Sequence, residues 1–174
     1  MALGGESSSY ENLDFSSSLE DSLLREEIES TERYALSPNS ETVSESLGLP
    51  GTFLFAPITG TVTSDFDAAT GHYGIDVAAK EGETIKAIYD GTVVMASYTT
   101  DGGNVIRIQH ANNLISVYKH NSVLLKEVGD RVEAGDFIAI IGNTGELTDG
   151  PHLHFELWYN GTPLNPKEFI AFSS

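Results

Sequence analysis

Short runs of Val, Ile and Thr recur along the chain from position 52 onward, separated by Gly, Asp and Asn at intervals of about ten residues. This spacing is typical of strands joined by tight turns, so we expect an all-β fold: a compact antiparallel sandwich or barrel-like domain. The strongest strand predictions are 84–89, 92–98, 104–110, 114–120, 137–142 and 152–159. Hairpin turns are expected at Asp101-Gly102-Gly103 and Asn160-Gly161, because Gly and Asn readily adopt positive φ angles.

The run 152–157 alternates strictly between polar and apolar residues. Its polar positions are His152, His154 and Glu156, and its apolar positions are Leu153, Phe155 and Leu157. Because successive side chains of a strand point to opposite faces, the apolar set is predicted to enter a core while the polar set faces a site.

The run 72–77 shows the same alternation. Its polar side would carry His72, Gly74 and Asp76, and its apolar side would carry Tyr73, Ile75 and Val77. Gly74 lacks a side chain, so we expect it to leave room for a metal or a substrate to approach closely.

Two or three imidazoles and one carboxylate form the ligand set that Zn²⁺ prefers. Three protein ligands plus a water make an open, catalytic zinc site, whereas a structural site usually closes its fourth position with cysteine. This chain contains no cysteine. A lone histidine is usually a surface or core residue, and either motif alone is weak, but the two together predict metal-assisted hydrolysis.

Six stretches of the chain resemble, in order and spacing, the lysostaphin-like (LytM-type) zinc metallopeptidases, which cleave the peptide cross-bridges and stems of bacterial peptidoglycan. The stretches are His72-Tyr-Gly-Ile-Asp76, 86–94, 116–120, 128–136, 141–145 and Gly150-Pro-His-Leu-His-Phe-Glu156. The resemblance extends from about residue 55 to 166. It implies a duplicated hybrid motif fold and one Zn²⁺ ion per chain.

The resemblance also implies a role for each site residue. The zinc ligands would be His72, Asp76 and His154, and the catalytic histidines would be His120 and His152. His152 is favoured as the general base and His120 as the group that orients or stabilises the oxyanion, although the sequence does not separate the two roles. Glu156 would contact a ligand or else face solvent. His110 is expected to be structural.

The function implied is a zinc endopeptidase that acts on peptides of the bacterial wall. The main alternative is a non-catalytic wall-binding module or an activator of another wall hydrolase, and a protein-directed endopeptidase also stays open. One departure keeps these alternatives in view: 64–71 lacks the arginine that many relatives carry before the first histidine. A lipoyl- or biotinyl-carrier domain is excluded, because the hairpin 143–150 has no lysine for cofactor attachment.

The amino-acid composition limits the classes of partner that this chain is expected to bind. The net charge is −17, from 9 basic and 26 acidic residues, which argues against nucleic-acid binding. A monomer is expected. A wall substrate implies the cell envelope, periplasmic or extracellular, yet the chain shows neither a signal peptide nor a transmembrane segment. We therefore expect an upstream membrane anchor or signal outside this sequence.

Residues 1–51 differ from the rest. The first 50 residues contain 11 acidic and 2 basic residues among many serines, a composition that favours disorder. A short helix is the alternative, because Ser18 and Asp21 resemble a weak capping box ahead of Leu23, Leu24 and Ile28. We expect an acidic linker or arm at 1–51 and the metallopeptidase domain at 52–174.

Overall fold

The computed structural model describes residues 54–145 and 150–172. The expected arm at 1–51 and its helix lie outside these residues. The strands are β1 (Thr61–Ser64), β2 (Ile75–Ala78), β3 (Thr84–Lys86), β4 (Gly91–Thr99), β5 (Gly103–Gln109), β6 (Leu114–Leu124), β7 (Arg131–Val132), β8 (Phe137–Ile141), β9 (His152–Tyr159) and β10 (Thr162–Leu164). In this part of the chain they are accompanied by three short 3-10 helices: η1 (Ala68–Thr70), η2 (Ala111–Asn113) and η3 (Pro166–Glu168). Among the described residues no helix is long and apolar enough to cross a membrane.

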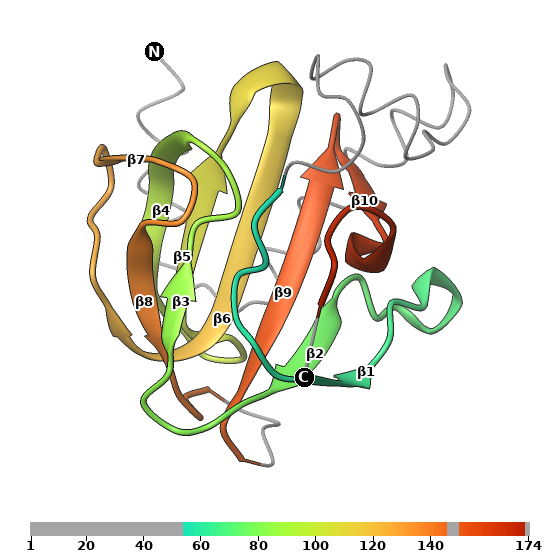
Figure 1. Cartoon of the computed structure of the whole chain (residues 1–174). Helices are drawn as coiled ribbons and strands as arrows, with labels where there is room; N and C mark the ends of the chain where they lie inside the picture. Colours follow the sequence, from blue (N-terminus) through green and yellow to red (C-terminus); the bar gives the residue numbers. More distant parts are fainter. Residues whose placement is uncertain (1–53, 146–149, 173–174) are drawn as a thin grey trace, which may run out of the picture.

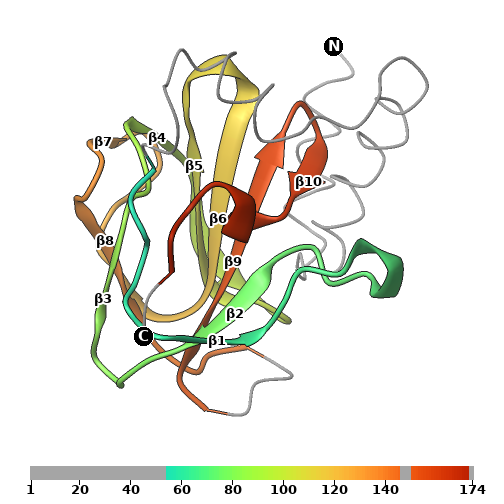
Figure 2. The ribbon, with the colours of Figure 1, turned by 45° about the vertical axis from the view of Figure 1, so that its right-hand side comes forward.

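All the strand pairs are antiparallel, as predicted, and their main order is β1-β2-β9-β6-β5-β4-β7. β10 extends the sheet beside β9, and β3 pairs with β8. β6 connects two layers, because its first part pairs with β9 and its last part, Asn121–Leu124, pairs with β8. Figure 2 shows β3 and β8 at the left of the molecule and β5, β6 and β9 through its centre.

The main core fills the space between the two layers. Phe155 packs there against Tyr118, with ring centroids 5.2 Å apart. Burying each large apolar side chain contributes about 1.5–3 kcal/mol, which fixes the face that each strand turns inward. The core residues from β2, β8 and β9 are Ile75, Val77, Ile138, Ala139, Ile141, Leu153, Phe155 and Leu157. The prediction that the apolar residues of 152–157 enter a core is therefore confirmed.

The opposite face of β5, β6 and β9 carries a smaller buried cluster of Val105, Val117 and Trp158. Because side chains alternate, the polar residues of β9 lie on this second face. The candidate site lies there, outside the main core.

Several predicted boundaries change. β3 ends at Lys86 instead of residue 89, and β6 continues to Leu124 instead of ending at His120. The run 72–77 was expected to be one strand, but β2 begins only at Ile75. His72 lies before that strand and forms an isolated bridge with Asp67, so a turn and not a strand positions it.

Candidate metal centre

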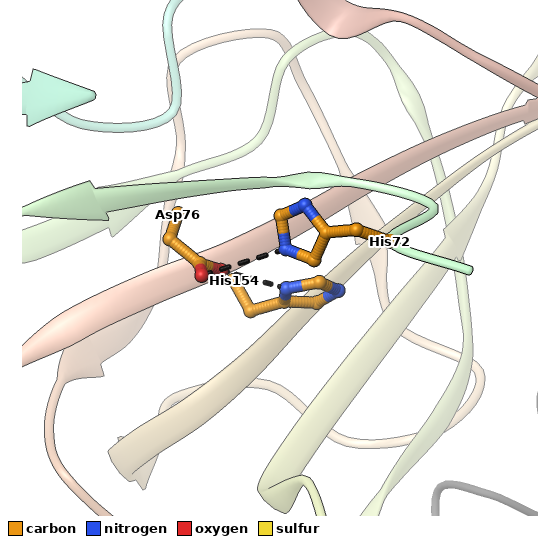
Figure 3. Close-up of side chains that lie close together, drawn as sticks. All are labelled: His72, Asp76 and His154. Carbon is orange, nitrogen blue, oxygen red and sulfur yellow. Dashed lines mark hydrogen bonds and ion pairs between the residues drawn. The ribbon is translucent and has the colours of Figure 1, made fainter. Parts of the chain in front are cut away.

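Asp76 and His154 are directly opposed across the antiparallel pair of β2 and β9. Opposed residues in such a pair project from the same face of the sheet. The Oδ1 atom of Asp76 lies 2.8 Å from Nδ1 of His154, a contact marked by a dashed line in Figure 3. Strand register therefore joins two motifs that are 78 positions apart in the sequence.

The turn that precedes β2 adds His72 to this pair. The side chain of Asp67 caps η1, and Gly71 ends the helix with φ of 83°, which returns the chain to its bridge at His72. The Nδ1 atom of His72 lies 2.7 Å from the backbone carbonyl of Asp65, which can only accept. The proton therefore belongs on Nδ1, and the lone pair of Nε2 faces the Asp76 carboxylate, 3.4 Å away (Figure 3).

These three residues fit a zinc ion by the chemistry of their donors. His72, Asp76 and His154 each offer one ligand atom, and the three atoms lie within 4.8 Å of one another. Two imidazoles and one carboxylate form an open set that leaves a position for water. The site thus brings together the three residues predicted as ligands.

Electrostatics make the cluster attractive to a cation. Burial alone lowers the pKa of His154, but hydrogen bonds with the carboxylates of Asp76 and Glu156 outweigh it and raise the pKa to about 9. Burial raises the pKa of Asp76, whereas its hydrogen bond with His154 and the neighbouring imidazoles lower it to a net value below the usual one. The carboxylates that draw a proton to His154 would equally draw a metal cation.

The second ring nitrogen of His154, Nε2, contacts a buried carboxylate. Its Nε2 atom lies 2.7 Å from Oε2 of Glu156, and Glu156 is only 2% exposed. The expected contact between Glu156 and a ligand is present, and the solvent-facing alternative is wrong. Two partners of Glu156 were missed: Lys119, whose Nζ atom lies 3.2 Å from Oε2, and Trp158, whose Nε1 donates to Oε1 at 2.9 Å. A lysine in a strand is usually predicted to be solvent-exposed, and only the apolar residues around Lys119 in the sequence favour its burial.

His120 reaches the site through an irregularity in β6. Tyr118 pairs with Ile106 and Asn121 pairs with Asn104, so β6 holds one residue more than β5 between these two pairs. His120 occupies this bulge with φ of 69°, in the left-handed region. Its ring thereby lies 6.3 Å from that of His154 (centroid to centroid) instead of on the core face.

Both predicted catalytic histidines are oriented by backbone carbonyls. Nδ1 of His120 lies 2.8 Å from the carbonyl of Thr144, and Nδ1 of His152 lies 3.0 Å from that of Gly150. Each ring therefore carries its proton on Nδ1 and keeps the lone pair of Nε2. Burial lowers the pKa of His120 to about 4, so that this imidazole is neutral at pH 7.

The fifth histidine lies elsewhere. His110 is 3% exposed, and its ring contacts the carbonyl of Asp90 and the hydroxyl of Ser116. It links the end of β5 to β6 and fits the structural role expected for it.

Comparisons with known proteins agree with this geometry. The family model described as "Peptidase family M23" matches residues 70–166. This span includes the three predicted ligands and the two predicted catalytic histidines: His72, Asp76, His120, His152 and His154. A structure of a zinc containing peptidase from Vibrio cholerae superposes with a TM-score of 0.61 at 30% identity, covering 71% of this chain and 41% of that one.

Two curated relatives have different functions in their names. The murein hydrolase activator NlpD of Salmonella dublin is 38% identical over 135 residues, 76% of this chain and 35% of that protein. The peptidoglycan DD-endopeptidase ShyC of Vibrio cholerae is 39% identical over 111 residues, 64% of this chain and 24% of that protein. The chain spans about a quarter to about a third of the length of the curated relatives it matches. On the family match over more than half of its length, this chain belongs to peptidase family M23.

Proposed function

We propose that this chain is a zinc-dependent endopeptidase that hydrolyses peptide bonds in peptidoglycan cross-links or stems, with residues 52–174 as its catalytic unit. The observation that carries the proposal is the juxtaposition of a three-residue zinc ligand set with two imidazoles that keep a free Nε2. The M23 membership and the peptidoglycan endopeptidase among the relatives support the substrate class and a place in the cell envelope.

His72, Asp76 and His154 would hold one zinc ion. When bound, zinc lowers the pKa of a coordinated water to about 7 and polarises a substrate carbonyl. The contacts of His72 with the Asp65 carbonyl and of His154 with Glu156 hold the two rings so that Nε2 and Nδ1, respectively, would be the ligand atoms.

The two remaining histidines would handle the protons. We assign His152 as the general base, which takes the proton of the attacking water on Nε2 and gives it to the leaving amine. His120 would hydrogen-bond the developing oxyanion or orient the water, a contact worth about 2.7–4 kcal/mol in a well-oriented site. The opposite assignment of the two rings is distinguished by the pH profiles of the single variants.

A second candidate is an activator of another wall hydrolase. It is favoured by the NlpD relatives, which match up to 76% of this chain. Retention of the ligand set and of both catalytic histidines favours the enzyme.

The deciding experiment is mass spectrometry of purified peptidoglycan digested with zinc-loaded protein, with His154→Ala as the control. New peptide fragments with free amines, absent from the control digest, would support the endopeptidase and identify the bond. Unchanged muropeptides would reject it. Stimulation of a purified murein hydrolase by both the wild type and the control would then support the activator.

A further inference from the structure

We propose that Lys119 is a positioning residue of the zinc site, which holds the Glu156 carboxylate against Nε2 of His154 so that Nδ1 is the atom offered to the metal. The inference rests on the proposed function in so far as it requires zinc at this cluster. It concerns a residue that is not one of the three proposed ligands.

The Glu156 carboxylate is fixed by three donors. Oε1 accepts from the indole of Trp158 at 2.9 Å, and Oε2 faces both His154 Nε2 at 2.7 Å and Lys119 Nζ at 3.2 Å. The side chains of Lys119 and Glu156 are 5% and 2% exposed. In Figure 3 the other nitrogen of the His154 ring faces Asp76, so the two carboxylates hold opposite edges of one imidazole.

The sheet places Lys119 for this contact. Lys119 is the Cα partner of His154 in the β6–β9 register, and Val117 is the partner of Glu156. Lys119 therefore projects from the same face of the sheet as His154 and Glu156. It lies one residue before the bulge at His120. Gly102 makes room for its aliphatic stem, because a Cβ there would lie 3.3 Å from Cδ of Lys119.

The cost of burial explains why this pair acts as a unit. A buried carboxylate without a cationic partner loses its solvation by water, and two neutral donors do not replace that loss. A metal-bound His154 is neutral, so Lys119 is then the cation that keeps Glu156 in place. With Lys119 removed, the Glu156 carboxylate would turn away from this buried position, and it would stop accepting from Nε2.

The test uses Lys119→Met, Lys119→Arg and, as a matched control, Lys126→Met at a half-buried lysine that follows the end of β6. Zinc affinity is measured by competition with a chromogenic chelator, and the Nε2–H of His154 is followed by ¹H–¹⁵N NMR of the zinc-loaded protein. We expect Lys119→Met to bind zinc about 10–100-fold more weakly and to lose the protected Nε2–H signal, while Lys119→Arg restores much of both. Lys126→Met should match the wild type.

The direction of the change is diagnostic. Removing a cation near a bound metal strengthens binding if charge repulsion is the only effect, so unchanged or tighter zinc binding in Lys119→Met would overturn the proposal. Where Lys119→Met does not fold, the double variant Lys119→Met/Glu156→Gln removes both charges, and wild-type affinity in it would likewise overturn the proposal. Failure of the wild type to bind zinc would instead reject the proposed function.

Discussion

The rings of His120 and His152 lie with their centroids 4.8 Å apart and their planes inclined at 47°, although the two residues come from different strands. Each ring commits Nδ1 to a backbone carbonyl, which leaves the two Nε2 atoms beside the candidate ligand cluster of His72, Asp76 and His154. Such a pair suits a reaction in which one imidazole moves a proton while the other steadies the charge that develops.

His120→Ala and His152→Ala should therefore keep zinc and lose activity. We expect a fall in kcat/KM of about 10²-fold or more for each, the range of general acid–base catalysis, with zinc content unchanged. Muropeptide turnover measures the activity of each variant, and metal analysis of the same preparations measures its zinc content. Normal turnover in either variant would show that the histidine it lacks has no catalytic role.

The ligand variants should behave in the opposite way. Because the cluster offers one atom from each residue, Asp76→Ala and His154→Ala should abolish zinc binding. Metal content after dialysis against a weak chelator measures this, and activity should vanish with the metal. Near-stoichiometric zinc in both variants would place the ion elsewhere.

Gly74 was expected to leave space for a metal or a substrate, but the protein itself fills that space. A Cβ at this position would lie 2.4 Å from the backbone oxygen of Phe155 and 3.1 Å from Nε2 of His154. Gly74→Ala should thus push β9 away, destabilise the fold by about 1–3 kcal/mol and weaken zinc binding.

Gly71→Ala is the matched control for this variant. Nothing lies within 4 Å of a Cβ at Gly71, although its φ of +83° disfavours alanine. It should cost about 1 kcal/mol from the backbone conformation alone and leave zinc affinity intact. Urea unfolding and zinc titration of the two variants separate crowding from backbone strain, and equal zinc affinities would contradict the crowding argument.

His110 should make stability depend on pH. Burial disfavours the charged imidazole and lowers the pKa of His110, so below about pH 6.5 the unfolded chain binds a proton that the folded chain does not. Its contribution to the free energy of unfolding is therefore full above that pH and declines as the pH falls. His110→Leu should cost about 1–3 kcal/mol at pH 7.5, through its unpaired partners, and less at pH 5. A gap that stays constant or widens on acidification, in paired urea titrations, would count against this account.

Alternation of polar and apolar residues predicted the part of the site that regular strands build. It separated His152, His154 and Glu156 from the core residues between them, because the pleat of β9 is unbroken. It could not place His120, whose position depends on an extra residue in β6 and a left-handed backbone. The burial of Lys119 was not predicted for another reason. Whether a charged side chain is buried depends on its partner, and Glu156 lies 37 positions away in the sequence.

The bulge at His120 also makes the chemistry of this fold sensitive to the length of one strand. Deletion of His120 itself, the left-handed residue between Tyr118 and Asn121, would restore regular pairing with β5 and keep Lys119 beside Glu156. The sheet would then lose its irregularity and the left-handed residue, which costs about 1–2 kcal/mol, so such a protein would fold at least as well. It would nevertheless lack an imidazole opposite His152, and a natural or engineered homologue shortened at this point would be a stable protein without the second catalytic group.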